Sequence, residues 1–228
     1  MEEALDGTSL LEGTEDKWVW THDTAAGFSV KSAYLILQSR CGNSSYSVAL
    51  ERACRQLWRC SVPSKFMVHG WRVLHKRLAT KDALLDRGIF PNQIDPLCVF
   101  CEGATETCNH MLFSCPFAYG VWLLVYGWLG FDGAYAMNGV DHFLQHGSLF
   151  GGKKWKKIKH LVWLATVWSL WISRNKVIFE GKDVSKNDVL SNVKLLSWSW
   201  FIYRAGLKPD CSYSEWCSRP AICMELIG

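Results

Sequence analysis

The chain has 228 residues, of which 49% are hydrophobic and 14% aromatic, including 13 tryptophans. A chain of this length and apolar content can bury one or two sizeable cores, which excludes a disordered tail. The net charge of +4 is unevenly spread, because residues 1–16 carry six of the 21 acidic residues and no Lys or Arg. We therefore expect a flexible acidic lead-in over residues 1–15 and a basic main body.

The ten cysteines are unevenly spaced, and the first residues do not resemble a secretory signal. A disulfide framework is typical of small proteins in oxidising compartments. We therefore expect reduced cysteines and an intracellular protein, with the choice between nucleus and cytoplasm left open.

The first structured elements are expected just after the lead-in. Trp18 and Trp20 alternate with polar neighbours, and a turn-like stretch separates them from Phe28, which predicts a small β-hairpin. Ser29 can cap a helix over residues 30–38. A polar loop then leads to a second helical region over residues 51–60.

A third helix is expected after Pro63, which suits a first-turn position. One face of this helix carries apolar residues at helical spacing, namely Met67, Trp71, Leu74 and Leu78. Basic residues occupy another face and the positions after it: Lys65, His69, Arg72, Lys76 and Arg77. These residues are candidates for contacts with phosphate, but a solvated helix face explains them equally well. A short helix capped by Thr80 should end at Gly88.

The strongest motif has the form C-x2-C-x8-H-x4-C and consists of Cys98, Cys101, His110 and Cys115. Three thiolates and one imidazole form a tetrahedral zinc site, and four protein ligands leave no open position for catalysis. The motif therefore predicts one structural Zn²⁺. The alternative is a set of buried free cysteines with an ordinary histidine, and Cys108 is a possible substitute ligand.

The charge around this motif argues against direct phosphate binding by the metal loop. Residues 88–152 contain no Lys or Arg, and three thiolates with Zn²⁺ carry a formal charge of −1. We therefore expect the loop to be a scaffold, with any nucleic acid bound on the basic faces that flank it.

A helix with Pro116 in its first turn should follow the motif. Residues 111–131 are uncharged and long enough to span a membrane, but they contain Pro116 and three glycines and have no flanking cations. We therefore expect a buried core helix rather than a membrane span.

The C-terminal half should begin with a connection over residues 131–152. The longest predicted helix covers residues 153–180, is apolar on nearly every side over 161–172, and should be buried. Ser185 and Asp188 predict a capping box that opens another helix. The long helix starts with a basic cluster: Lys153, Lys154, Lys156, Lys157 and Lys159.

An ordered set of motifs resembles the zinc-binding domain of plant non-LTR (LINE-type) retrotransposon reverse transcriptases. Its first part is Trp18-Val19-Trp20, Gly27 to Tyr34, Leu57-Trp58, Pro63 to Phe66 and Trp71 to Thr80. Its second part is Cys98, Cys101, Glu106-Thr107, His110 to Phe113, Cys115 and Trp122. The sequence after this domain in plant copies is also similar here, at Trp168, Trp171, Ser173 to Asn175, Ile178-Phe179, Trp198, Trp200 and Glu215 to Cys217.

The resemblance implies that Cys98, Cys101, His110 and Cys115 bind zinc and that Cys108 does not. It implies a domain over residues 16–130, a Trp-rich helical region over 153–205, and contacts with RNA or DNA or with the reverse transcriptase polypeptide. One departure is His69, where the family more often has an aromatic or aliphatic residue.

The tail over residues 206–228 is expected to be irregular. The fold class is therefore mainly α with one small hairpin, stapled by zinc.

Three functions were weighed. A nucleic-acid-binding zinc module is favoured, and the alternative is a structural remnant that docks on a polymerase or on itself. Enzymatic activity of its own is not expected, because polymerases need paired carboxylates for metal ions and the chain has no Asp-Asp dipeptide. A nucleophile pair from Cys54 or Cys60 with His69 or His75 has no third group to orient it in the sequence. We expect no small-molecule substrate.

Overall fold

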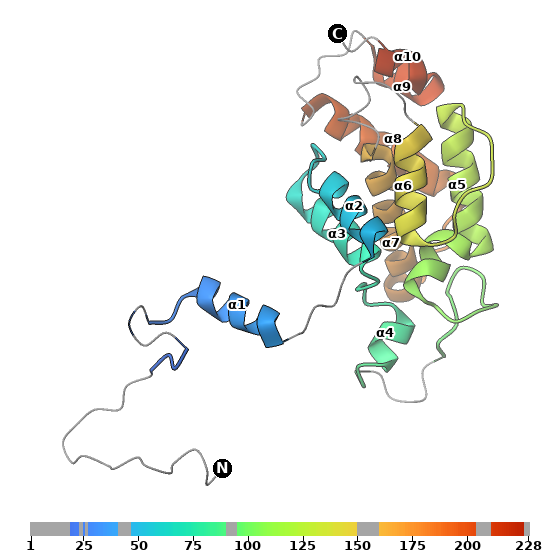
Figure 1. Cartoon of the computed structure of the whole chain (residues 1–228). Coiled ribbons are helices and arrows are strands. Elements are labelled where there is room, and N and C mark those ends of the chain that lie inside the picture. The colour runs from blue at the N-terminus through green and yellow to red at the C-terminus, as the bar shows by residue number, and fades with distance from the viewer. Residues whose placement is uncertain are drawn as a thin grey trace, which may run out of the picture. The chain divides into compact units, whose positions relative to one another are not determined.

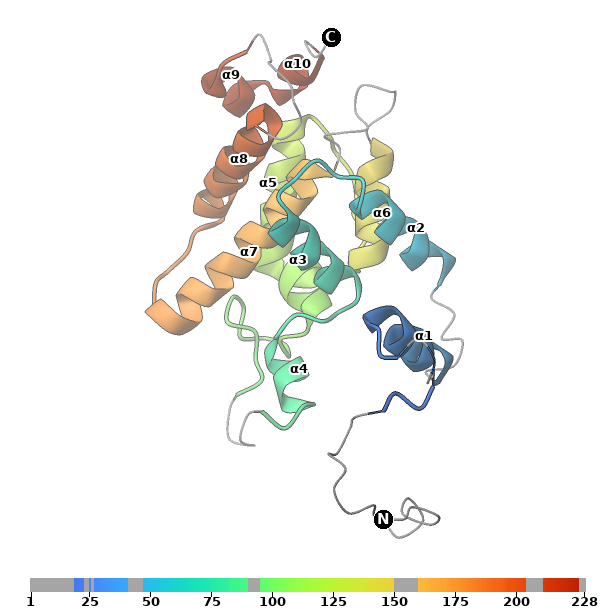
Figure 2. The ribbon, with the colours of Figure 1, turned by 90° about the vertical axis from the view of Figure 1, so that its left-hand side faces the viewer.

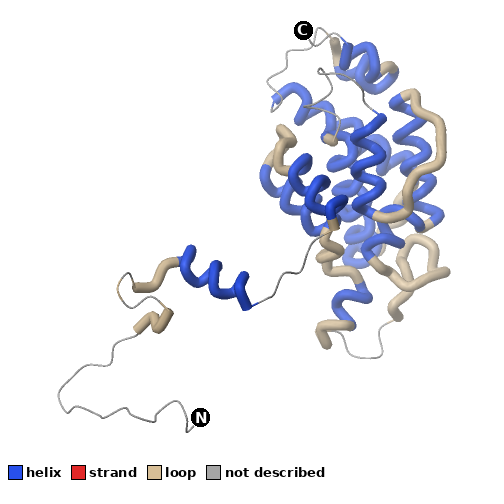
Figure 3. Tube along the Cα trace, in the orientation of Figure 1, coloured by secondary structure: helices blue, strands red, loops and turns tan. Residues whose placement is uncertain are grey.

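The structure is a computed structural model that describes residues 19–22, 25, 27–40, 47–89, 95–149, 160–203 and 211–225. The named secondary-structure elements of the described part are all helices (Figure 3), which agrees with the predicted fold class apart from the hairpin. Contacts divide the chain into two units, Met1–Tyr46 and Ser47–Gly228.

The first unit contains helix α1, Val30–Arg40. The Ser32 amide donates to the Ser29 hydroxyl over 3.0 Å, so the predicted cap at Ser29 is confirmed. The predicted hairpin is wrong for the described residues, which contain no strand before α1; Trp18 lies outside them. Trp20 instead packs edge-on against Phe28, with ring centroids 5.1 Å apart, so the aromatic pattern reflects ring packing rather than a strand ladder.

The second unit is a helical assembly built around α7 (Figures 1 and 2). Helix α7 contacts α3, α5 and α8, and α2 contacts both α3 and α6. The main helices are α2 (Val48–Leu57), α3 (Ser64–Leu74), α5 (Pro116–Leu129), α6 (Gly139–Leu149), α7 (Leu161–Glu180) and α8 (Lys186–Tyr203). A short α4, Lys81–Leu85, precedes the metal loop.

Helix α7 contains more buried residues than any other described helix. Every residue from Leu161 to Val167 is buried, which confirms that a segment apolar on all sides is covered by several partners. Those partners come from both the predicted zinc-binding domain and the predicted Trp-rich region, since α3 and α5 precede α7 and α8 follows it. The two regions therefore share one core.

Two predicted boundaries hold because the capping residues are local. The Asp188 amide donates to Ser185 Oγ over 3.1 Å and the Ser185 amide donates to Asp188 Oδ2 over 3.0 Å, which forms the predicted capping box of α8. Pro116 occupies the first turn of α5, and Gly130 ends that helix with φ +79°.

Helix α6 lies within the residues that were predicted to be a connection. Its start is capped by Asn138, whose Oδ1 accepts from the Asp141 amide over 3.0 Å. The helix has little continuous apolar periodicity, because two of its buried positions are His142 and His146. Its burial against α2 supplies the stabilisation that the local pattern does not reveal.

The tail over residues 206–228 was predicted to be irregular, and this is wrong for its described part. Helix α9 covers Tyr213–Ser218 and α10 covers Pro220–Glu225. Ser212 and Glu215 form a capping box, and the Trp216 indole is fully buried, donating to Ser197 Oγ of α8 over 3.2 Å. Docking of this tryptophan on α8 explains why so short a helix forms.

No helix among the described residues is long and apolar enough to cross a membrane. In α5, which lies in the uncharged stretch of residues 111–131, Val121, Trp122 and Val125 are buried in the protein core. The expectation of a core helix is therefore confirmed.

A close approach between α3 and α7 depends on Gly70. A Cβ added at Gly70 would lie 2.5 Å from Leu164 Cδ2 and 3.1 Å from Leu57 Cδ1. Gly127, near the end of α5, is exposed and has nothing within 4 Å of such an atom.

We predict opposite effects of the same substitution at these two glycines. Gly70→Ala should destabilise the protein by about 1–3 kcal/mol through overpacking, whereas Gly127→Ala should stabilise it by about 0.5–1 kcal/mol through helix propensity. Urea unfolding of both variants beside the parent measures the difference. Equal free energies of unfolding for the two variants would contradict the close packing of α3 on α7.

Candidate metal centre

The first two cysteines of the motif lie on a tight loop closed by a single β-bridge. Leu97 pairs with Thr105 in antiparallel fashion, and the Cys98 amide donates to the Ala104 carbonyl over 2.8 Å. The Glu102 amide donates back to the Cys98 carbonyl over 2.8 Å, and Glu102 has φ +52°. This local turn holds the side chains of Cys98 and Cys101 together.

The other two ligands are brought together by a π-helical turn, His110–Ser114 (η2). The Cys115 amide donates to the His110 carbonyl over 2.8 Å, which is a hydrogen bond between residues five apart. In an α-helix, two residues five apart point about 140° away from each other. The wider π turn brings them closer to the same side, so the four-residue gap in the motif fits this geometry.

The four donor atoms form one cluster in which all lie within 4.8 Å of one another. Cys98 Sγ lies 3.9 Å from Cys115 Sγ, and Cys101 Sγ lies 3.2 Å from His110 Nε2. Two sulfurs bound to one tetrahedral ion at about 2.3 Å each would be about 3.8 Å apart. The donor set and its spacing are consistent with one zinc site.

The surroundings of Cys115, which directly precedes α5, favour a thiolate there. The contact with Cys98 is the largest cause that lowers the pKa of the Cys115 thiol to about 5, and the nearby backbone amides of Ala118 and Phe117 also lower it. The same pairing raises the pKa of Cys98. A thiolate is the form in which cysteine binds zinc.

Cys108 does not belong to this cluster. Its Sγ lies 3.8 Å from the Val73 carbonyl oxygen of α3, and the side chain is buried. Burial raises the pKa of the Cys108 thiol to about 12, which keeps it protonated at neutral pH. The structure thus offers no role for Cys108 as a ligand.

The cluster of four ligand side chains is continuous with the hydrophobic core. Cys98 and Cys115 are 0% exposed, and Met111, Leu112 and Phe113 lie between the last two ligands and are buried. The Trp122 indole of α5 donates to the Leu112 carbonyl over 2.8 Å. The turn that carries two ligands therefore also carries core side chains.

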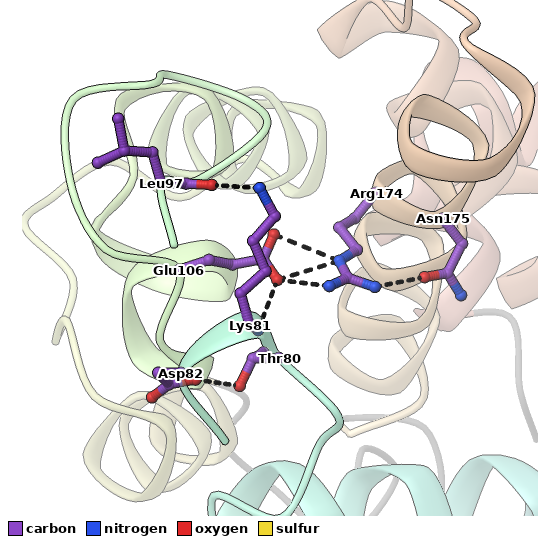
Figure 4. Close-up of polar contacts among 7 residues, drawn as sticks. All are labelled: Thr80, Lys81, Asp82, Leu97, Glu106, Arg174 and Asn175. Carbon is purple, nitrogen blue, oxygen red and sulfur yellow. Dashed lines mark hydrogen bonds and ion pairs between the residues drawn. The ribbon is translucent and has the colours of Figure 1, made fainter. Parts of the chain in front are cut away.

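A buried ion pair joins the metal loop to α7 (Figure 4). Glu106, between Cys101 and His110, accepts hydrogen bonds from Arg174 Nη2 at 2.6 Å and from Arg174 Nε at 3.2 Å. The two side chains are 0% and 5% exposed. In the sequence, both residues stand out only as parts of the family resemblance, because no local pattern indicates that residues 68 positions apart are paired.

Other groups satisfy the remaining hydrogen-bonding capacity of Glu106 and Arg174. The Lys81 amide at the start of α4 donates to Glu106 Oε1 over 3.1 Å, and Lys81 Nζ donates to the Leu97 carbonyl over 2.7 Å. Arg174 Nη1 donates to Asn175 Oδ1 over 3.0 Å, and the guanidinium lies 5.0 Å from the centre of the Trp171 ring. The pair thus fixes α4, the metal loop and α7 relative to one another (Figure 4).

The predicted nucleic-acid residues separate into three groups. Lys65, His69 and Arg72 line one pocket with a volume of about 420 Å³, together with Trp168 and Trp171 of α7. Lys76 and Arg77 are exposed beyond α3 and do not line it. The candidates Lys153, Lys154, Lys156 and Lys157 lie outside the described residues.

The buried face of α3 differs from the predicted stripe. Phe66, His69, Gly70, Val73 and Leu74 are buried, whereas Met67 and Trp71 are only partly buried. His69 had been placed on the basic face, and this is wrong as a description of its exposure. It packs edge-on against Trp168, at 5.1 Å between ring centroids, which no local pattern could show.

One of the weighed nucleophile pairs does come together. Cys54 Sγ lies 3.5 Å from His75 Nε2. Burial raises the pKa of the Cys54 thiol and lowers that of His75. Both shifts oppose a thiolate–imidazolium pair, so the contact does not have the properties of an activated nucleophile.

We predict that purified protein contains one zinc per chain and that the Cys98→Ser/Cys115→Ser variant contains none. Loss of the metal should also reduce helical circular dichroism, because the ligand turn carries core residues. Cys108→Ala is the matched control and should keep its zinc. The zinc content of each protein is measured by mass spectrometry. A well-folded parent without zinc, or a double variant that still contains zinc, would contradict the assignment of the four ligands.

We predict that Glu106→Gln or Arg174→Met destabilises the protein by about 3–5 kcal/mol, because each leaves one uncompensated buried charge. The double variant Glu106→Gln/Arg174→Met should recover much of this loss, as measured by urea unfolding with zinc present. Glu180→Gln, which breaks the exposed ion pair with Lys182, is the control and should change little. Additive single effects would rule out direct coupling between Glu106 and Arg174.

Comparison with known proteins gives two matches. Residues 28–122 match the family described as "zinc-binding in reverse transcriptase". A protein of Arabidopsis thaliana named "Putative ribonuclease H protein" is 27% identical over 120 residues, which is 51% of this chain and 18% of the relative's length. No solved structure matches the chain. With the Cys98–Cys115 ligand cluster inside the matched region, residues 28–122 are a zinc-binding domain of the type found in reverse transcriptases.

Proposed function

We propose that this chain is a non-catalytic accessory module that is stabilised by one structural zinc and binds nucleic acid. The observation that carries the proposal is the cluster of four protein ligands in the core of a domain of the reverse transcriptase type. Such a cluster shapes a fold rather than performing chemistry, since four protein ligands complete a tetrahedral zinc site.

The distribution of charge supports different roles for the ligand loop, as a scaffold, and for the surface that binds nucleic acid. The loop that carries the ligands lies in a stretch, residues 88–152, without Lys or Arg. A site with three thiolates and Zn²⁺ has a net negative charge there, which disfavours phosphate close to the metal. Nucleic acid is therefore proposed to lie on a different surface.

The proposed surface is formed by α3 and the turn after it. Lys65, Arg72, Lys76 and Arg77 are exposed there. The ion pairs among the described residues involve Arg55, Arg174 and Lys182, so none of these four cations is neutralised by one. Unpaired Lys and Arg on one surface are the usual means of binding phosphates.

The relative's name refers to ribonuclease H, and that name describes a protein more than five times the length of the matched region. The match here is to a zinc-binding domain rather than to a catalytic one. We propose that this chain contributes binding to such an assembly and not hydrolysis. Docking on a reverse transcriptase polypeptide without nucleic-acid contacts is the competing proposal.

We predict salt-dependent binding of labelled single-stranded RNA or DNA by the purified, zinc-loaded chain, measured by fluorescence anisotropy. If the four exposed cations each contact one phosphate, affinity should fall by roughly 50-fold between 50 and 200 mM salt. Changing Lys65, Arg72, Lys76 and Arg77 to Gln should remove most of this dependence.

The control variant replaces two exposed cations elsewhere, Arg52→Gln in α2 and Arg219→Gln directly after α9. This variant should keep both the affinity and its salt dependence. Absence of binding at 50 mM salt by zinc-loaded, folded protein would reject the nucleic-acid proposal and favour the docking role.

A further inference from the structure

The pocket between α3 and α7 combines aromatic rings with positive charge. Phe66 and Trp168 pack edge-on at 4.8 Å between centroids, and Trp168 and Trp171 are only partly buried where they line the pocket. Its volume of about 420 Å³ lies within the range of small-ligand sites. Planar ligands favour such a wall, because rings stack on exposed indole surface.

Cations border this aromatic wall. Lys65 Nζ lies 4.8 Å from the centre of the Phe66 ring and 5.6 Å from that of Trp168. Arg72 lines the same pocket about two turns further along α3, and none of the described residues that line it is acidic. The pocket therefore favours a ligand that carries both a planar ring and negative charge.

His69 adds an unsatisfied hydrogen-bonding group to the wall of the pocket. The residue is 6% exposed, and its Nε2 has no hydrogen-bond partner among the described residues. Burial lowers the pKa of His69 to about 4, against a hydrogen bond to the Val167 backbone, so the ring is neutral at pH 7. A neutral imidazole has one donor and one acceptor nitrogen, so the unpartnered Nε2 can pair with a polar group of an incoming ligand.

A second, smaller pocket shares Trp168 with the first. It has a volume of about 160 Å³, and its lining includes Trp168, Ile172, Leu195 and Lys176. Trp168 thus lines both pockets, and each pocket is also lined by a lysine. Aromatic surface together with positive charge is typical of grooves that bind single strands.

We propose that the pocket lined by Lys65, His69, Arg72, Trp168 and Trp171 holds one unpaired base of single-stranded nucleic acid. The base stacks on the indole of Trp168, the flanking phosphates contact Lys65 and Arg72, and a polar group on the base edge meets His69 Nε2. A duplex does not fit this description, because its bases are already stacked and paired. This proposal rests on the proposed nucleic-acid function. It adds the position of the binding site and a preference for single strands over duplexes.

The test compares an eight-nucleotide single strand carrying all its bases with one of the same length made only of abasic sugar–phosphate units, each labelled with fluorescein. Trp168→Leu should weaken binding of the base-containing strand by about 5- to 150-fold, the range reported for loss of one stacked base. It should leave binding of the abasic strand within twofold. Trp58→Leu, an exposed tryptophan outside the pocket, is the control and should not discriminate between the strands.

Two further variants separate the contribution of the His69 ring to binding from that of the positive charges of Lys65 and Arg72. His69→Phe keeps a ring against Trp168 but removes the polar nitrogen, so it should weaken only the base-containing strand. Lys65→Gln/Arg72→Gln should weaken both strands and lower the salt slope by about 1.4, from two lost phosphate contacts. Zinc content and circular dichroism confirm that each variant is folded.

The outcomes distinguish this inference from the proposed function. If the parent binds no oligonucleotide, both proposals fail. If it binds single strands but Trp168→Leu and His69→Phe act equally on base-containing and abasic strands, the pocket proposal fails and general phosphate binding remains. Preference for a duplex over a single strand also overturns the pocket proposal alone.

Discussion

The buried ion pair between Glu106 and Arg174 is the constraint on which the arrangement of the second unit depends. Glu106 belongs to the loop that carries the metal ligands, and Arg174 belongs to α7, so one interaction sets the loop against this helix. Burial makes this pair sensitive to loss of either partner, because the remaining charge would be uncompensated. The Lys81 amide and Asn175 satisfy further hydrogen-bonding capacity of the pair, which holds the start of α4 in the same network.

Metal binding and core packing meet at the turn between His110 and Cys115. Its π-type hydrogen bond brings two ligands toward one side, while Met111, Leu112 and Phe113 enter the core. The same few residues therefore serve both purposes, so zinc affinity and the free energy of unfolding should be coupled. The cluster shows why a domain without an extensive sheet can hold an irregular loop in a defined conformation.

The molecule separates the cluster of thiols from its exposed cations. The ligands occupy a stretch without Lys or Arg, whereas Lys65 and Arg72 lie on α3 beside the tryptophans of α7. Residues from the zinc-binding domain and from the region that follows it thus form one pocket. A family match limited to residues 28–122 contains α3 but not α7, so it leaves out the tryptophans of this pocket.

The sequence by itself determined the features that depend on local spacing: the ligand set at Cys98, Cys101, His110 and Cys115, and the helix starts at Ser29, Pro116 and Ser185. Capping and ligand spacing act over a few residues, so a linear pattern contains them. Only the tertiary structure decided the Glu106–Arg174 pair, the burial of His69, and the helices α6, α9 and α10. Each of these depends on a partner far away in the chain, such as Ser197 for Trp216, and the free energy of that contact outweighs the weak local preference. For the residues that the structure describes, the predicted hairpin was wrong for the converse reason: alternating aromatics near Trp20 indicate a strand only where a neighbouring strand exists to pair with it.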